Sequence, residues 1–142
     1  MIRVLHIQQT IGSGGVERRR LSLAKYLDKD KFQLKIACTD FIGDFHQKFE
    51  DENVELLPVG VLRHPFDLKI HRRIQKIIDE YKPHILHGAV FEGVTMAAFN
   101  GFLKRVPIVI IEETSDPENT RSWKANVLMM LFARLSDKAI GV

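Results

Sequence analysis

Short apolar runs alternate along the chain with longer segments in which apolar residues recur every three or four positions. The short runs are nearly continuous in apolar character, which is typical of strands covered on both faces of a sheet. The longer segments have the spacing of one helix face, best seen in 68–81, after which comes Pro83. The pattern predicts strands at 3–7, 32–38, 54–59, 84–88, 108–113 and 138–142, and helices at 16–27, 44–53, 68–81, 91–104 and 120–135.

This alternation predicts an α/β fold, a doubly wound parallel sheet with helices on both faces. A length of 142 residues fits a single domain with one core. In such sheets, ligands bind beyond the carboxyl ends of the strands. Four stretches with polar residues lie at the ends of predicted strands, so we expect them to meet at one edge: 12–17, 40–44, 87–92 and 112–116.

The composition is that of an ordinary globular protein, with 45% hydrophobic and 27% charged residues and a net charge of +3. So small a charge does not favour a nucleic-acid partner, but it suits an anionic small molecule or an acidic membrane surface. Cys38, the single cysteine, lies in a predicted strand, which indicates a buried thiol in a reducing compartment. The most apolar run, 127–133, is far shorter than the roughly 20 residues of a membrane-spanning helix. We expect a cytoplasmic protein, with peripheral contact at the inner membrane face left open.

The stretch IGSGGVERRR, from Ile11 to Arg20, places three glycines between the first predicted strand and the next helix. The backbone N–H groups of such a turn, with the helix dipole behind them, suit a bound phosphate. The stretch lacks the Lys-Ser/Thr pair of a P-loop, and Glu17 stands where a dinucleotide fingerprint has its third glycine. Asp40, at the end of the second strand, would still suit a ribose hydroxyl. Three interpretations remain open: a phosphate site, a dinucleotide site, or a tight turn without a ligand.

Four further segments follow one another along the chain: IGSGGVERRRLSLAKYL, YKPHILHGAVFEG, RVPIVIIEETSDP and LSDKAIGV. In this order they resemble the N-terminal, acceptor-side domain of family-4 glycosyltransferases, which are retaining enzymes with the GT-B fold. The first segment is similar to the family's G-G-x-E segment, and the second to the segment leading into its fourth strand. The third resembles the proline-led fifth strand with its active-site loop, and the fourth the link toward a second domain. The resemblance covers the entire chain and implies a Rossmann-like domain.

This resemblance implies transfer of a sugar, with retention, from a nucleotide-sugar donor to a hydroxyl of a sugar, glycan or lipid-linked acceptor. In the family, a C-terminal domain holds most of the donor nucleotide. We expect that domain to be absent from residues 1–142, so this fragment alone would be inactive. The resemblance also implies that this domain binds no metal and no cofactor. His84 and His87, a close pair, would point to opposite faces of a strand, which argues against a shared metal.

Site residues follow from the same resemblance. The donor phosphates would bind at Gly12, Gly14 and Gly15. The reacting groups would lie nearest His87 and Glu113. Many relatives have histidine at the position of Glu113, and a carboxylate donates a proton only if its pKa is raised. The acceptor would contact four more residues: Glu17, Arg20, Glu92 and Asp116. Arg20 departs from the family, whose members commonly have an apolar residue at this position.

Several of these residues also have a purely structural interpretation. Glu17 stands where a helix dipole favours an acid, and Glu92 where a helix begins. Arg20 falls within an apolar helical stripe, from which it would reach an anionic ligand or extend outward to solvent. Asp116 would shape a turn or cap the following helix.

Two wider alternatives also stay open. The chain would fit a nucleotide- or dinucleotide-binding enzyme of another class, or a non-catalytic domain that keeps the fold. The apolar helix at 120–135 is expected to be buried in the core, the alternative being contact with a membrane.

Overall fold

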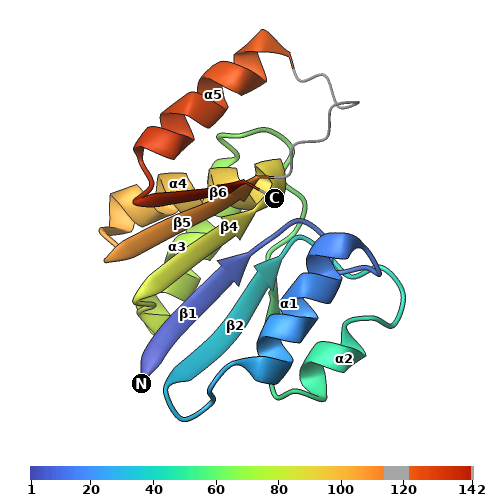
Figure 1. The fold of residues 1–142 in the computed structure, drawn as a ribbon. Helices are drawn as coiled ribbons and strands as arrows, with labels where there is room; N and C mark the ends of the chain where they lie inside the picture. The colour runs from blue at the N-terminus through green and yellow to red at the C-terminus, as the bar shows by residue number, and fades with distance from the viewer. Residues whose placement is uncertain (114–121, 142) are drawn as a thin grey trace.

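The computed structural model describes residues 1–113 and 122–141. All of its strands belong to one parallel sheet with the order β3-β2-β1-β4-β5-β6 (Figure 1). The strands are β1 (Ile2–Ile7), β2 (Phe32–Cys38), β3 (Glu55–Pro58), β4 (Ile85–Ala89), β5 (Ile108–Glu113) and β6 (Lys138–Gly141). The order reverses between β1 and β4, where His6 is the register partner of His87. This is the strand order of a Rossmann-like sheet, and it confirms the predicted fold class.

Helices cover both faces of the sheet, as predicted. They are α1 (Gly15–Tyr26), α2 (Gln47–Glu50), α3 (Leu68–Tyr81), α4 (Val90–Lys104) and α5 (Trp123–Arg134). One face packs against α1 and α2, where Leu34 and Ile36 of β2 are buried. The other face packs against α3 and α4, where Leu5 and Ile7 of β1 are buried. Beyond α4, α5 packs on the same face, near the last two strands of the sheet, β5 and β6 (Figure 1).

Most element bounds agree with the sequence pattern to within one residue. The exception is the helix predicted at 44–53, of which only Gln47–Glu50 is helical. Gly43 and Asn53 bracket this segment with φ values of +64° and +59°, so the backbone leaves the helical region on both sides. The predicted residues 120, 121 and 142 lie outside the described part of the chain.

Cys38 lies in the layer between the sheet and α1, with none of its surface exposed. Burial and the nearby Asp40 carboxylate raise the pKa of its thiol to about 12. The thiol is therefore protonated and enclosed at neutral pH, as the sequence predicts.

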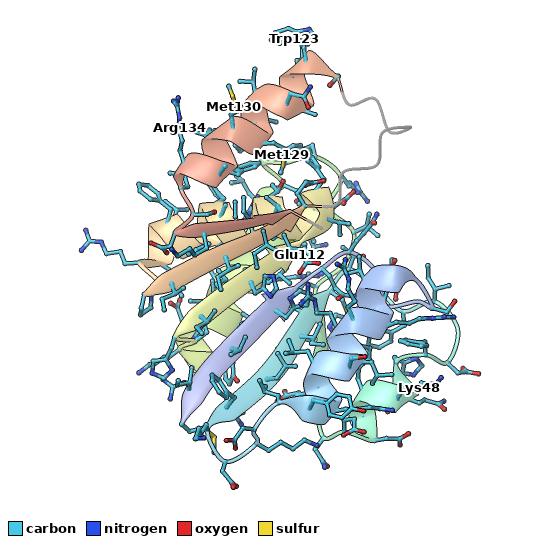
Figure 2. The ribbon with its side chains drawn as sticks, viewed as in Figure 1. Lys48, Glu112, Trp123, Met129, Met130 and Arg134 are labelled. Atoms are coloured by element: carbon cyan, nitrogen blue, oxygen red, sulfur yellow. The ribbon has the colours of Figure 1, made fainter. Side chains whose placement is uncertain are left out.

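The expectation that the last helix is buried is wrong. Only Phe132 of α5 is buried, whereas Trp123 is 72% and Met130 62% exposed. The reason is the position of α5 at the end of the sheet, where a single stripe that includes Phe132 packs toward α4 and Ile111. Trp123 and Met130 point away from the body of the molecule in Figure 2. None of the helices in the described residues is long and apolar enough to span a membrane.

Candidate functional site

The glycine loop, residues 12–15, joins β1 to α1 at the carboxyl edge of the sheet. Gly14 is the N-cap of α1, with φ at −73°, and its cap has no side-chain hydrogen bond among the described residues. Gly14 and Gly15 are exposed. A Cβ built on Gly15 meets nothing within 4 Å, so the fold itself does not require glycine there. The first-turn N–H groups of this 12-residue helix are thus open to an anionic ligand.

Glu17 lies in the first turn of α1, half-buried beside this loop. Its carboxylate accepts a long hydrogen bond of 3.4 Å from the backbone N–H of Gly12. A Cβ on Gly14 would come within 2.6 Å of the same carboxylate. Glu17 therefore supports the loop, a contact that fits its structural interpretation and leaves its acceptor role a prediction.

The turn from β4 into α4 is unusually tight. A Cβ on Gly93 would lie 2.3 Å from the carbonyl oxygen of Ile7, so only glycine lets α4 approach the end of β1 this closely. Val90, the first residue of α4, has φ at +55°, a conformation that a β-branched residue rarely adopts. Such backbone strain persists where packing on both sides enforces it. The turn sets Glu92 in the first turn of α4, half-buried at the same edge as the glycine loop.

Arg20 and Glu112 form a buried ion pair between α1 and the end of β5. Their side chains are 8% and 6% exposed, and Nη2 of Arg20 contacts Oε2 of Glu112. Arg19 adds a second contact of 3.0 Å to Oε1 of the same carboxylate. Burial, and then Arg19, lower the pKa of Arg20 to about 10, which leaves it cationic at neutral pH. Arg20 thus neither extends to solvent nor waits unpaired for an anionic ligand.

His87 of β4 lies next to this ion pair. Glu112, the acid of the pair, is labelled in Figure 2. Its Nε2 atom lies 3.4 Å from Oε2 of Glu112, without the alignment of a hydrogen bond. Its ring meets that of His6 edge-on, with centroids 4.8 Å apart. Burial, and then the Arg20 charge, lower the pKa of His87 to about 4. His87 is therefore neutral at physiological pH.

Glu113 ends β5 beside Glu112, but the two side chains lie on opposite faces of the sheet. Glu112 faces α1, whereas Glu113 lies on the face of Ile111, which packs against α4. The structure thus brings the glycine loop, His87, Glu92 and Glu113 to the carboxyl edge of three adjacent strands. Their chemical roles stay predictions. Asp116 lies outside the described residues.

Sequence reasoning missed the link between Arg20 and Glu112, which are 92 positions apart. The available signal was a cation in an apolar helical stripe together with an acid at the end of a buried strand. Asp40, considered for a ribose hydroxyl, is exposed and accepts a 2.8 Å hydrogen bond from the N–H of Phe41. Within residues 1–113 and 122–141, no three histidine, cysteine or acidic side chains are placed to hold a metal ion.

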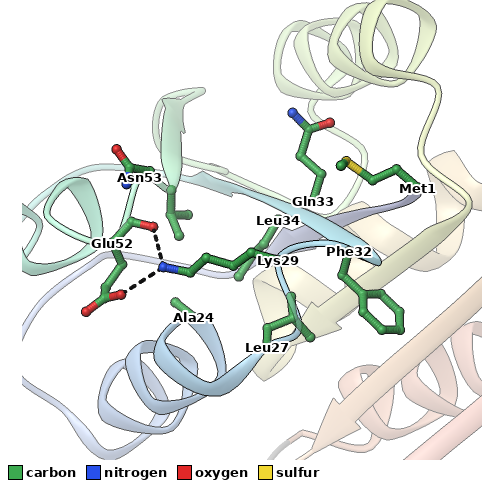
Figure 3. Close-up of a pocket in the computed structure, with 10 residues that line it drawn as sticks. Met1, Ala24, Leu27, Lys29, Phe32, Gln33, Leu34, Glu52 and Asn53 are labelled. Atoms are coloured by element: carbon green, nitrogen blue, oxygen red, sulfur yellow. Dashed lines mark hydrogen bonds and ion pairs between the residues drawn. The ribbon is translucent and has the colours of Figure 1, made fainter.

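Of two cavities in the described residues, one adjoins the site and the other does not. One of about 660 Å³ adjoins the glycine loop at Ser13 and runs along 42–51, with Lys48 in its wall. Another, of about 260 Å³, lies at the amino ends of the strands, as Figure 3 shows. There Lys29 bridges to Glu52 across apolar walls. This second cavity is at the edge opposite to the predicted site.

Three solved structures have a fold similar to that of this chain. MurG from Acinetobacter baumannii matches with a TM-score of 0.67 and 17% identity, over 97% of this chain and 41% of that one. UDP-GlcNAc 2-epimerase from Neisseria meningitidis, bound to UDP-GlcNAc, matches with a TM-score of 0.58 and 13% identity. The match covers 99% of this chain and 40% of that one. UDP-GlcNAc 2-epimerase from Methanocaldococcus jannaschii matches with a TM-score of 0.60 and 17% identity. The match covers 97% of this chain and 39% of that one. The chain spans about two fifths of the length of these proteins. No curated protein matches it.

Fold and site together define a Rossmann-like domain of the GT-B type, with its candidate site at the carboxyl edge of the sheet. The model of Glycosyltransferase Family 4 matches residues 13–142. The chain belongs to this family.

Proposed function

We propose that this chain is the N-terminal, acceptor-side domain of a retaining glycosyltransferase that uses a nucleotide-sugar donor. The observation that carries the proposal is the open N-terminus of α1 at the same sheet edge as the Arg20–Glu112–His87 cluster. Membership in Glycosyltransferase Family 4 supports sugar transfer as the reaction. A structurally similar epimerase bound to UDP-GlcNAc supports a nucleotide sugar as the donor.

The donor diphosphate is assigned to the glycine loop. Gly14 and Gly15 are exposed and carry no side chain, so a phosphate can approach the first-turn N–H groups of α1. The bond from the anomeric carbon to the diphosphate breaks, and the diphosphate leaves with the bonding electrons. The N–H groups and the helix dipole stabilise the charge that builds up there. In this proposal neither a metal nor a cofactor is bound by the domain, and a second domain holds the nucleotide.

The acceptor is assigned to the edge formed by β4, α4 and β5. Its hydroxyl oxygen forms the new bond to the anomeric carbon and gives its proton to the departing diphosphate oxygen. Glu92 and Glu113 stand at this edge and are suited to accept hydrogen bonds from acceptor hydroxyls. Glu17 and Asp116 complete the predicted acceptor contacts. Arg20 is proposed to act on the acceptor through Glu112, because its guanidinium already contacts that carboxylate.

A peripheral contact with a membrane is proposed for α5. Trp123, Val127, Met130 and Leu131 are between 47% and 72% exposed on this helix. Its charged residues are cations, Lys124 and Arg134, with no acid from 123 to 134. Exposed aromatic and aliphatic side chains next to cations suit the interface of an anionic bilayer. Such a contact would hold the domain at the cytoplasmic face of the membrane, next to a lipid-linked acceptor.

A second surface also combines exposed apolar side chains with nearby cations. The segment from Val61 to Leu68, which leads into α3, exposes Val61, Phe66 and Leu68 by 50% or more. Arg63, Lys69 and Arg73 line the cavity of about 490 Å³ beside it. This segment leads into α3, which packs on the same face of the sheet as α4 and α5.

The proposal is tested by replacing Gly15 with leucine in the full-length enzyme. A side chain there would block the approach of phosphate, so sugar transfer should be lost while the unfolding midpoint stays unchanged. Ser22→Leu is the control, because Ser22 is an exposed residue further along the same helix, away from its N-terminus. Undiminished transfer by Gly15→Leu would mean that the loop is only a turn.

A further inference from the structure

Buried polar atoms without hydrogen-bond partners gather where β1, β4 and β5 meet α1. Within the described residues they are Nδ1 of His6, Nε of Arg20 and Nε2 of His87, while Oε1 of Glu112 has only its 3.0 Å ion-pair contact with Arg19. Leaving such an atom unpaired costs about 1–3 kcal/mol, and native proteins have few of them. A buried ion pair also adds little stability compared with apolar side chains of the same size. Stability alone therefore does not account for this cluster.

The contact between His87 and Glu112 determines which ring nitrogen carries the proton. Nε2 of His87 lies 3.4 Å from Oε2 of Glu112. Two guanidinium groups contact this carboxylate, which suits its ionised form, and an ionised carboxylate only accepts hydrogen bonds. A lone pair on Nε2 would face another lone pair and repel it. This repulsion favours the proton on Nε2, and in a neutral ring the lone pair is then on Nδ1.

We infer that Glu112, held by Arg20, is the positioning residue of His87: it fixes the tautomer with the proton on Nε2, so that Nδ1 accepts a hydrogen bond from an acceptor hydroxyl. The assignment of the tautomer stands on the contacts of this chain alone. The part that concerns the acceptor rests on the proposed function.

The charge of the ring depends on the groups that face it from each packed element. These are His6 from β1, Arg20 from α1 and Glu112 from β5, with Arg19 behind the carboxylate. Burial and the Arg20 charge lower the pKa of His87 to about 4. Burial, Arg20 and His87 hold the pKa of His6 well below its ordinary value. Both rings are neutral at pH 7, so Nδ1 of His87 accepts rather than donates.

This arrangement gives a reason for an arginine within an apolar stripe. Without Arg20, the Glu112 carboxylate would be poorly balanced by Arg19 alone, whose side chain is 40% exposed. It would then attract a proton to the neighbouring His87 ring. An imidazolium ring has two donors and no acceptor, so it could no longer bind a hydroxyl through its hydrogen.

The tautomer can be read directly from two-bond nitrogen–proton NMR correlations of the ¹⁵N-labelled 142-residue chain at pH 7. We expect His87 to show a protonated Nε2 and an unprotonated Nδ1. Glu112→Gln offers the ring an amide donor, so a population protonated on Nδ1 should appear. A wild-type ring protonated on Nδ1, or the same tautomer in wild type and Glu112→Gln, would overturn the inference.

Three further variants separate this role from a purely structural effect. Glu55→Gln removes the partner of Lys35 on β3, and it should leave the His87 signals unchanged. The double variant Arg20→Met/Glu112→Leu removes both charges, so it should fold with undiminished stability and lose the fixed tautomer. In Arg20→Met alone, the pKa of His87 should rise by more than about 1. An unchanged pKa would contradict the balancing role of Arg20.

The link to the acceptor is tested in the full-length enzyme. Glu112→Gln should lower kcat/KM for the acceptor about 2- to 10-fold, the value of one neutral hydrogen bond, and leave the donor KM unchanged. A changed tautomer with unchanged acceptor kinetics would overturn the hydroxyl part of the inference. If the wild-type enzyme transferred no sugar at all, the proposed function would fail and the tautomer assignment would stand.

Discussion

The neutral, buried His87 makes the stability of the domain depend on pH. In the unfolded chain its ring has the ordinary pKa of 6.5, whereas in the fold the pKa is about 4. Between these values the unfolded state binds more protons, so the free energy of unfolding falls as the pH falls. From pH 7 to pH 5 the unfolded ring gains about 0.7 of a proton and the folded ring about 0.1. Since the side chain is only 12% exposed, the expected loss from this one group is about 2 kcal/mol.

Urea unfolding followed by circular dichroism at pH 7 and pH 5 measures this loss. Other groups titrate in the same range, His6 in the same direction, so the informative quantity is the difference between variants. His87→Gln should reduce the loss by about 2 kcal/mol. Ser22→Ala, at an exposed residue without a titratable group, should leave the loss as in wild type. An equal loss in wild type and His87→Gln would refute the claim that His87 is buried as the neutral ring.

Two further predictions concern the tight turn and the exposed helix. Gly93→Ala should lower the free energy of unfolding by about 2 kcal/mol or more in urea titrations, because its Cβ would lie 2.3 Å from the carbonyl oxygen of Ile7. Gly15→Ala should change it by less than about 0.5 kcal/mol, since its Cβ meets nothing within 4 Å, and a similar loss in both variants would contradict this contrast. Trp123, the single tryptophan, should shift its fluorescence to shorter wavelength with anionic vesicles and less so with zwitterionic ones. Lys124→Glu should weaken that shift, and a spectrum unaffected by anionic vesicles would exclude α5 as the contact.

The fold could be predicted because each level of the sequence pattern points to the same architecture. The apolar run at 36–38 is buried on both faces, and the stripe of α3 is the one that meets the sheet. Given alternating strands and helices, the handedness of the crossovers leaves few topologies. The edge that carries the candidate site follows as well, because parallel strands bring their carboxyl ends together.

The ion pair between Arg20 and Glu112 could not be predicted in the same way. Local pattern says that each position is buried, but it does not say which distant element lies opposite. The pair forms only because α1 packs next to the end of β5, 92 residues further along the chain. Val90 is a similar case: its β-branched side chain argues against φ at +55°, and the contacts of Gly88 and Gly93 override that preference.

The exposed face of α5 marks another limit of the sequence pattern. The pattern shows that the helix is apolar, but the number of its faces that find a partner depends on the position of the helix. Because α5 packs through one stripe that includes Phe132, the side chains of Trp123 and Met130 remain outside. Composition alone cannot separate a buried helix from one that binds a surface.

Titration of the 142-residue chain with donors and acceptors tests how the site is divided. The chain offers the donor the N–H groups of one helix end, and a helix dipole contributes only about 0.3–2 kcal/mol to binding a charge. We therefore expect UDP- and GDP-sugars to bind no more tightly than about 1 mM, with NMR shifts confined to the glycine loop. Sugar acceptors should bind more tightly than these donors, because the proposed acceptor residues Glu92, His87 and Glu113 all lie at the carboxyl ends of β4 and β5 or in the first turn of α4. The chain alone should transfer no sugar, since positioning two substrates between two domains supplies much of the rate. Tight binding of a nicotinamide dinucleotide that is lost in Asp40→Ala would instead favour a dinucleotide-binding enzyme. In that class, an acid at the end of β2 binds a ribose hydroxyl.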